Sequence, residues 1–398
     1  MTDAKAPMIV LLAGLALMSM GQTVLFAIFG PLGRDMGLSE LMIGGVISLS
    51  AIAVVVASPW WGRQSDRIGR KPVFVISALG LGLATLAFTA ALEAGRAGWV
   101  TGLAAFALFA GTRMIYGLGV TGIQPAAAGW VADTTTAQER TGGMAMIGAA
   151  FGIGSILGPT LAWLLSGFDL LLPLYVIAVG GLIVAGFAWR FLPETRQRTE
   201  RPTVSLSPLD PRLTATLATV VCVFSVIAGL QQTLAFYVQD IGQLTNVETA
   251  RRVGQAFALL AAVLFATQIL VAVRKPKPKR ILLLGLILGA TGAAVLLALP
   301  TPPGILVAHA FLGLGMGLAV PGLQGLASIA VGEDEQGTVG GLVAAAMAGG
   351  FALGPLLGTA LYGFWPGAPY VLAIVLLLGA AIVSFGRPPQ SPPRHHPL

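Results

Sequence analysis

Long apolar runs separated by short polar breaks repeat along the whole chain. A run of about 20 residues is long enough to cross the ~30 Å hydrocarbon core of a bilayer as a helix. The pattern predicts an all-α integral membrane protein. Its twelve expected transmembrane helices cover residues 8–30, 41–61, 73–92, 99–131, 141–165, 171–192, 211–238, 249–273, 281–300, 304–331, 338–362 and 368–386.

The composition agrees with a membrane protein. Of the 398 residues, 56% are hydrophobic and 10% are charged, whereas about a quarter of the residues in a typical soluble domain are charged. The single cysteine, Cys222, lies inside an apolar run and excludes a disulfide framework or a cysteine metal site. We therefore expect no metal and no cofactor.

The basic residues show which ends of the helices face the cytoplasm. An even number of crossings puts both termini on one side, and if that side is cytoplasmic most of the 23 Lys and Arg residues lie in cytoplasmic loops. This distribution predicts that both termini lie in the cytoplasm; the bacterial inner membrane is the location expected from the family resemblance described below. The distribution also assigns the net charge of +7 to membrane topology, so no nucleic-acid partner is expected.

Two related halves are expected. A shift of 196 residues lays Gly158-Pro159 on Gly354-Pro355, and a shift of 210 lays Gln22-Thr23 on Gln232-Thr233. Such repeats are typical of transporters. The predicted parts are a six-helix bundle at 1–192, a polar linker at 193–210, a second six-helix bundle at 211–386 and a disordered Pro-rich tail at 387–398.

A dense charged stretch separates the second and third apolar runs. It reads Gly-Arg-Gln-Ser-Asp-Arg-Ile-Gly-Arg-Lys-Pro over residues 62–72, which predicts a short loop at a membrane face with tight bends at its glycines. The spacing resembles the loop between helices 2 and 3 in the major facilitator superfamily. The matching residues are Gly62, Asp66, Arg67, Gly69, Arg70 and Lys71.

The resemblance implies a major facilitator fold and a latch on its cytoplasmic face. Asp66 would cap a helix of the opposite half near residues 337–340, where the positive end of a helix dipole favours an anion. Asp133, at the end of the fourth expected helix, would pair with Arg70. The corresponding stretch of the second half, residues 274–280, is basic without glycine or acid, so the latch is expected on one side only.

The fourth expected helix carries a charge deep in the membrane. Arg113 lies about 21 Å along this helix from Trp99, where a charge costs about 2.5–3.5 kcal/mol on insertion scales. The sequence around Arg113 resembles the arginine motif of the superfamily, with Tyr116 where glutamine is common. We expect Arg113 to bind the anionic group of a substrate and Tyr116 to lie in the same site.

Small residues line the fifth expected helix. Closely spaced glycines form a flat face for helix packing, and a proline bends the helix. The set is Gly148, Gly152, Gly154, Gly158 and Pro159. A packing surface explains it fully, but the run also resembles the Gly-Pro motif of superfamily exporters, the antiporters, and so favours outward transport.

Further candidates lie on three helices. Gln22 with Phe26, and Gln232 with Phe236, are spaced i and i+4 on one face each, suited to an amphipathic organic substrate or to helix contacts. His309, which corresponds to Arg113 in the repeat, is either a hydrogen-bonded packing residue or a proton carrier, since a histidine can titrate near neutral pH. The candidates for proton coupling are His309, Asp35 and Glu40.

These patterns predict a transporter and not an enzyme. No acidic residue is expected at mid-membrane depth, so the cavity around Arg113 should prefer anionic or carboxylate-bearing drugs, siderophores or metabolites. We expect a monomeric exporter of the drug:proton antiporter type, with a small molecule, protons and the lipid bilayer as partners. The alternative is a proton-coupled importer of a sugar or an organic acid, and a membrane enzyme or sensor is disfavoured.

Overall fold

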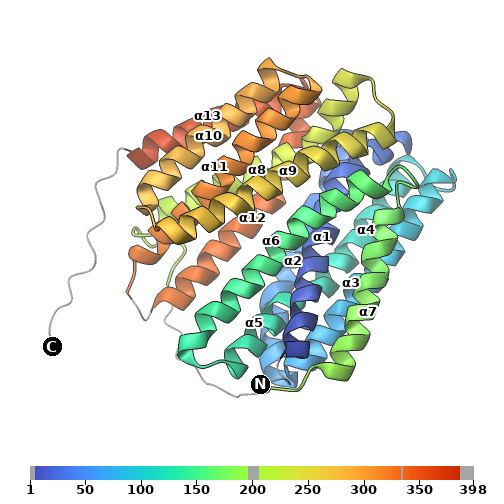
Figure 1. Cartoon of the computed structure of the whole chain (residues 1–398). Helices are drawn as coiled ribbons and strands as arrows, with labels where there is room; N and C mark the ends of the chain where they lie inside the picture. Colours follow the sequence, from blue (N-terminus) through green and yellow to red (C-terminus); the bar gives the residue numbers. More distant parts are fainter. Residues whose placement is uncertain (1–4, 196–205, 333–334, 386–398) are drawn as a thin grey trace. The chain divides into compact units, whose positions relative to one another are not determined.

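The computed structural model describes residues 5–195, 206–332 and 335–385, and in them the chain is helical without strands (Figure 1). The helices are α1 Lys5–Asp35, α2 Glu40–Ile68, α3 Arg70–Arg96, α4 Gly102–Val120, α5 Ile123–Thr134, α6 Ala137–Leu165, α7 Leu172–Phe191, α8 Thr214–Gly242, α9 Asn246–Arg274, α10 Pro278–Ala298, α11 Pro302–Ile329, α12 Gln336–Tyr362 and α13 Ala368–Phe385.

Twelve segments of the described chain have the composition of membrane spans. Eleven are long and apolar enough to cross a bilayer, with α4 and α5 counted together as Gly102–Thr134, and Ala368–Ser384 within α13 is a shorter apolar helix. The predicted all-α membrane fold is therefore confirmed, with eleven of the twelve expected spans long enough to cross a bilayer in the described chain and the twelfth shorter. The last expected helix, at 368–386, ends one residue past the described chain. The predicted tail at 387–398 lies outside the described residues.

The expected helix at 99–131 is divided in two. Pro125 has no N–H to donate to the carbonyl of Thr121, and its ring crowds that carbonyl. Thr121 and Gly122 lie between the two helices but keep right-handed helical angles, with φ of −63° and −73°. The interruption is therefore a kink within one crossing. Its counterpart in the repeat, Pro321, lies inside α11 without dividing it.

The predicted loop at 62–72 is almost entirely helical, so the expected bend at Gly62 is wrong. Helix α2 continues to Ile68 and α3 begins at Arg70. Only Gly69 separates them, with a φ of +109° that side-chain-bearing residues rarely adopt. The apolar pattern marked where α2 leaves the expected bilayer, but its backbone hydrogen bonds continue beyond that point. A single glycine makes the whole turn.

The chain forms two compact units. In its described part, the first unit contains 5–195 and 234–258, and the second contains 206–233, 259–332 and 335–385. The expected boundary at the 193–210 linker therefore does not separate the units completely. Residues 234–258 follow this linker in the sequence but belong to the first unit. The last turns of α8 and the first half of α9 belong to the first unit.

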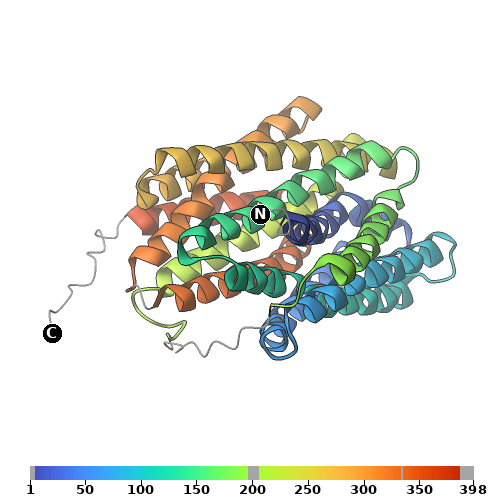
Figure 2. The same cartoon turned by 60° about the horizontal axis from the view of Figure 1, so that its bottom comes forward.

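Glycines of α6 let it pack closely along α1 in the first unit (Figures 1 and 2). A Cβ atom at Gly158 would lie 2.8 Å from the Met20 carbonyl oxygen, and one at Gly154 would lie 2.8 Å from the Ser19 Cβ. A Cβ at Gly148, in contrast, would have no neighbour within 4 Å. Only part of the predicted small-residue face is thus a close contact.

The same arrangement recurs in the second unit at positions shifted by 196 residues. A Cβ at Gly350 of α12 would lie 2.8 Å from the Val221 carbonyl oxygen of α8, and one at Gly354 would lie 2.7 Å from the Ala228 Cβ. These glycines correspond to Gly154 and Gly158. The repeat therefore extends from the sequence to the contacts of a helix pair in each unit.

Candidate functional site

Arg113 lies in the interior of the first unit on α4. Its residue is only 5% exposed, and its guanidinium carbon lies 4.0 Å from the centre of the Tyr116 ring and 5.5 Å from that of Phe88. The faces of aromatic rings attract a cation electrostatically. No carboxylate lies within ion-pair distance of Arg113 in the described chain. Two rings therefore stabilise the buried charge.

Unused hydrogen-bonding groups accompany this charge. The Nε of Arg113 and the hydroxyl of Tyr116 are buried and have no hydrogen-bond partner among the described residues. The hydroxyl reaches towards α1, because a Cβ at Gly21 would lie 3.1 Å from it. Buried polar groups without partners are uncommon in native proteins. The pair is thus the strongest candidate in the described chain for contacting a polar group of a ligand.

The two predicted Gln-Phe pairs are placed differently. On α1, Gln22 is partly exposed and Phe26 is buried. On α8, Gln232 is 2% exposed and its Oε1 has no hydrogen-bond partner among the described residues, whereas Phe236 belongs to the first unit. The ring of Phe236 packs against Gly30 and has no exposed surface. Its predicted contact with a substrate stays a prediction.

His309 is buried in α11 of the second unit. Its Nδ1 lies 2.7 Å from the Ile305 carbonyl oxygen, one turn earlier in the same helix. One ring nitrogen is therefore engaged by the helix backbone.

Arg70 organises the turn between α2 and α3 on the predicted cytoplasmic side. Its Nε donates to Asp133 Oδ2 at 3.0 Å, which is the pair implied by the family resemblance. Its Nη1 donates to Ser65 Oγ at 3.1 Å and to Asp66 at 2.5 Å. Asp66 is therefore ion-paired with Arg70 in its own unit, and its side chain is 70% exposed. Arg67 is exposed and Lys71 partly exposed at the same turn.

The sequence analysis missed Glu194 at this turn. Its Oε1 accepts a hydrogen bond from the Arg70 backbone N–H at 2.9 Å, and so caps the start of α3. A Cβ at Gly69 would lie 2.5 Å from this carboxyl group. The start of the linker is also tied to α5, where Trp130 Nε1 donates to the Pro193 carbonyl oxygen at 3.2 Å. The linker therefore begins attached to the first unit.

A second missed cluster lies at the opposite ends of the helices in the first unit. Arg34, at the end of α1, donates to Glu40 of α2 at 2.7 Å and to Asp240 of α8 at 2.6 Å. Its guanidinium also lies 4.6 Å from the centre of the Phe236 ring. The signal in the sequence was an arginine flanked by acids at a predicted outer helix end. It could not identify Asp240, which is 206 positions away.

The predicted proton-coupling candidates of α1 and α2 lie in or beside this cluster. Glu40 accepts from Arg34, and Asp35 accepts a hydrogen bond from the Asn246 side chain of α9. Both acids are therefore engaged with polar partners at the helix ends. Their role in proton coupling stays a prediction.

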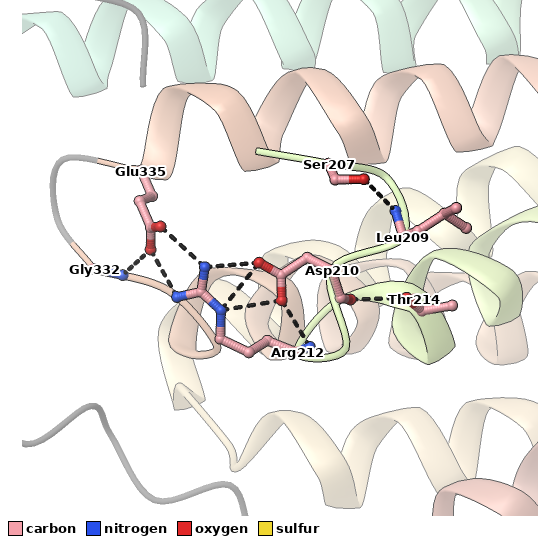
Figure 3. Close-up of polar contacts among 7 residues, drawn as sticks. All are labelled: Ser207, Leu209, Asp210, Arg212, Thr214, Gly332 and Glu335. Atoms are coloured by element: carbon pink, nitrogen blue, oxygen red, sulfur yellow. Dashed lines mark hydrogen bonds and ion pairs between the residues drawn. The ribbon is translucent and has the colours of Figure 1, made fainter. Parts of the chain in front are cut away.

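The second unit has its own cluster on the predicted cytoplasmic side, centred on Arg212 (Figure 3). Arg212 donates to Asp210 at 2.8 Å and to both carboxylate oxygens of Glu335 at 3.0 Å. Hydrogen bonds from Arg212 hold the pKa of each carboxyl group below its usual value, and the two acids raise the pKa of Arg212. The end of the linker is thereby tied to the residue preceding α12.

No group of three or more His, Cys, Asp or Glu residues suited to a metal occurs in the part of the chain that the structure describes. The chemistry present is a buried cation with aromatic neighbours, amides and charge clusters at helix ends. These features suit the binding and movement of a solute.

The fold and these features define a multi-pass membrane transporter. The model of the Major Facilitator Superfamily matches residues 11–348 and 277–398, and the chain belongs to this family of transporters. The predicted family is confirmed, as is the expectation that the protein is not an enzyme.

Relatives in this family include tetracycline and multidrug resistance proteins. The chain is 28% identical over 355 residues to the class B tetracycline resistance protein of Escherichia coli, covering 83% of this chain and 82% of that protein. It is 24% identical over 392 residues to multidrug resistance protein 2 of Bacillus subtilis strain 168, covering 96% and 95%. The relatives thus match nearly full length.

Solved structures share the fold. A bacterial homologue of the human lysosomal transporter Spinster, in an inward-facing and occupied conformation, has a TM-score of 0.73 at 15% identity, with 95% of each chain covered. The human organic anion transporter MFSD10 has a TM-score of 0.66 at 19% identity, with 96% of this chain and 100% of that chain covered.

Proposed function

We propose that this transporter exports small amphipathic organic anions from the cytoplasm. The observation that carries the proposal is the buried Arg113, which has two aromatic neighbours and no acidic partner among the described residues. An anionic group could complete the hydrogen bonding of Arg113 Nε and the Tyr116 hydroxyl. Gln22, Phe26, Gln232 and Phe236 are the further substrate contacts that we propose.

The relatives support outward transport of an organic compound. They include tetracycline and multidrug resistance proteins, and the bovine major facilitator superfamily domain-containing protein 10 is 27% identical to this chain over 363 residues. The human protein of that name is described as an organic anion transporter. Carboxylated drugs, siderophores and metabolites are the substrate classes that fit an arginine in an aromatic setting.

Electrical energy favours this direction. An anion that leaves a cell with a negative interior gains about 2.3 kcal/mol per charge for every 100 mV. Proton exchange would add to this drive, with His309, Asp35 and Glu40 as the candidate carriers. In the proposed orientation both termini lie on the cytoplasmic side of the inner membrane, and the protein works as a monomer.

The test compares Arg113→Ala with Arg190→Ala in cells preloaded with fluorescent organic anions. Arg190 is a matched control because its guanidinium also lies over an aromatic ring, at 5.2 Å from Phe191, but at the exposed end of α7. We expect Arg113→Ala to slow anion efflux at least about tenfold, corresponding to about 1.4 kcal/mol. Arg190→Ala should retain efflux, with both variants at normal levels in the membrane.

Unchanged anion efflux by Arg113→Ala would overturn the assignment, as would better transport of cationic dyes than of anions by the unaltered protein. Tyr116→Phe provides a milder variant. We expect it to raise the apparent KM for anions severalfold, because it removes the buried hydroxyl of the ring that lies beside the Arg113 guanidinium.

The competing function is a proton-coupled importer of a sugar or an organic acid. Uptake into energised cells that exceeds efflux from preloaded cells would favour it. Separate collapse of the pH gradient and of the voltage tests the coupling. If only loss of voltage stops efflux, protons are not exchanged.

A further inference from the structure

The turn between α9 and α10 concentrates positive charge at the predicted cytoplasmic ends of two membrane helices. Five bases occupy the seven residues 274–280, and the whole sequence between Glu248 and Glu333 contains no aspartate or glutamate. Four of these bases, Arg274, Lys275, Lys277 and Arg280, are exposed. We refer to these four side chains as the basic turn.

The backbone holds the basic turn close to the helix ends. Only residues 275–277 lie between α9 and α10. Lys275 has a φ of +44°, and its N–H donates to the Val271 carbonyl at 2.8 Å. The Lys277 carbonyl accepts from the Arg280 N–H at 3.0 Å, and Pro278 begins α10. The four side chains therefore start within about one helical turn of the membrane helices.

An exposed apolar stripe continues directly from the basic turn. Arg280, Leu284 and Ile287 follow one another at i, i+4 and i+7 on α10, which puts them on one helix face. Leu284 and Ile287 are 48% and 49% exposed. The opposite faces of α10 are packed, since a Cβ at Gly285 would lie 2.6 Å from the Ala319 N of α11 and one at Gly289 would lie 3.3 Å from Leu377 of α13.

The basic turn differs from the charged turn of the first unit. There, Arg70 is ion-paired with Asp66 and Asp133. None of the four bases of the basic turn forms an ion pair with an acidic side chain among the described residues. Its charge is therefore available to a partner from outside the chain.

We propose that the basic turn binds the headgroup of an anionic phospholipid, whose acyl chains lie along Leu284 and Ile287. The charge complements a phosphodiester, and the adjoining stripe complements a hydrocarbon chain. Clustered bases next to a membrane helix attract anionic lipid at about 1 kcal/mol per side chain near the surface. The site is distinct from Arg113 and depends only on the membrane topology.

The experiment uses the full chain purified in detergent and titrated with phosphatidylglycerol or phosphatidylcholine. Bound lipid is counted by native mass spectrometry, and the melting temperature is followed in parallel. We expect retained phosphatidylglycerol and a rise in melting temperature that phosphatidylcholine does not produce. The variant Arg274→Gln/Lys275→Gln/Lys277→Gln/Arg280→Gln should bind phosphatidylglycerol at least about tenfold more weakly.

Two further variants keep the result interpretable. Lys275→Gln/Lys277→Gln changes only exposed side chains of the turn and should show a partial loss if the larger variant fails to fold. Arg251→Gln/Arg252→Gln removes charge from the other end of α9 and should bind lipid as the unaltered protein does.

Equal retention of phosphatidylglycerol by the unaltered protein and both basic-turn variants would overturn the proposal. So would equal stabilisation by phosphatidylcholine, which would indicate a general lipid effect. Inorganic phosphate is added as a separate arm. If it alone reproduces the rise in melting temperature, the site binds free phosphate and the lipid assignment is wrong.

Discussion

Two buried or half-buried arginines of the first unit show how partners decide what a guanidinium can do. Arg34 donates five hydrogen bonds, to Glu40, Gln239 and Asp240, which matches its five N–H groups. Arg113 instead lies against two rings, and its Nε lacks a partner in the described chain. Arg34 is therefore suited to holding helix ends together, and Arg113 to receiving a ligand.

The Arg212 cluster should respond to acid in a defined direction. The pKa values of Asp210 and Glu335 are lowered in the folded chain, mainly by hydrogen bonds from Arg212. A lowered folded pKa contributes stability above the unfolded value, about 3.9 for Asp and 4.3 for Glu, and this contribution is lost as the pH falls through the folded value. The cluster should thus be intact at cytoplasmic pH.

The expected acid sensitivity of the Arg212 cluster can be checked by melting temperatures. These are measured for the unaltered protein and for Arg212→Gln from neutral pH down to about pH 3. We expect Arg212→Gln to melt at a lower temperature by a constant amount at neutral pH, and the difference to shrink below about pH 4. A difference that persists unchanged into acid would show that Arg212 stabilises the chain by means other than these carboxylates.

At the scale of residues, the sequence allowed prediction of contacts only where a family motif joined distant positions. Asp133 was identified as the partner of Arg70 in this way. Glu194 was not, because it is 124 positions from Arg70 and binds a backbone N–H, which leaves no trace in side-chain spacing. Asp240 was missed because it is 206 positions from Arg34 and no motif joins the two residues.

At the scale of elements, hydropathy predicted the number of membrane crossings but not the helix ends. Apolar residues mark where a helix lies in the bilayer, whereas its hydrogen bonds continue into polar sequence. Helix α2 accordingly runs through charged residues to Ile68. The kink at residues 121–122 has a local cause in Pro125, yet Pro321 leaves α11 undivided, so the proline alone was insufficient to predict it.

The α1–α6 pair provides a matched test of helix packing. Gly158→Ala would place a methyl group 2.8 Å from the Met20 carbonyl oxygen, and backbone cannot move aside cheaply. We expect a loss of about 1–3 kcal/mol in stability, as for overpacked cores, measured as a lower melting temperature. Gly148→Ala, with no neighbour within 4 Å, should be neutral or mildly stabilising.

Equal melting temperatures for the two alanine variants would contradict the close approach of α6 to α1. A loss of transport by Gly158→Ala without loss of stability would instead assign the glycine face a part in movement, as the resemblance to exporters suggests.

At the scale of the whole molecule, the internal repeat recurs in the contacts of one helix pair in each unit, but it does not match the extent of the compact units. The last turns of α8 and the first half of α9 belong to the first unit, although their sequence matches the second half. The repeat is a correspondence between the sequences of the two halves, whereas the units are defined by contacts between residues. Arg34, with its hydrogen bonds to Gln239 and Asp240, is one reason for the difference.

Alternating access requires a membrane transporter to expose its interior first on one side and then on the other. In the first unit, Arg34 joins the end of α1 to the end of α8 on the predicted outer side, between the carboxylates of Glu40 and Asp240. Without the arginine these two acids would repel each other. We therefore expect Arg34→Gln to increase opening between these helix ends.

Opening can be measured with a single introduced thiol. In a Cys222→Ser background, which removes the only native cysteine, Phe26→Cys places a thiol on α1, where the phenylalanine is buried. A membrane-impermeant maleimide added from the outer side should label this position about fivefold faster when Arg34→Gln is present, which corresponds to about 1 kcal/mol.

Arg96→Gln, which removes a charge pair with Asp169 elsewhere in the first unit, should leave labelling unchanged. Equal labelling with and without Arg34 would mean that its hydrogen bonds fasten the helix ends without governing access to the interior, whereas faster labelling only from the opposite side would reverse the proposed orientation.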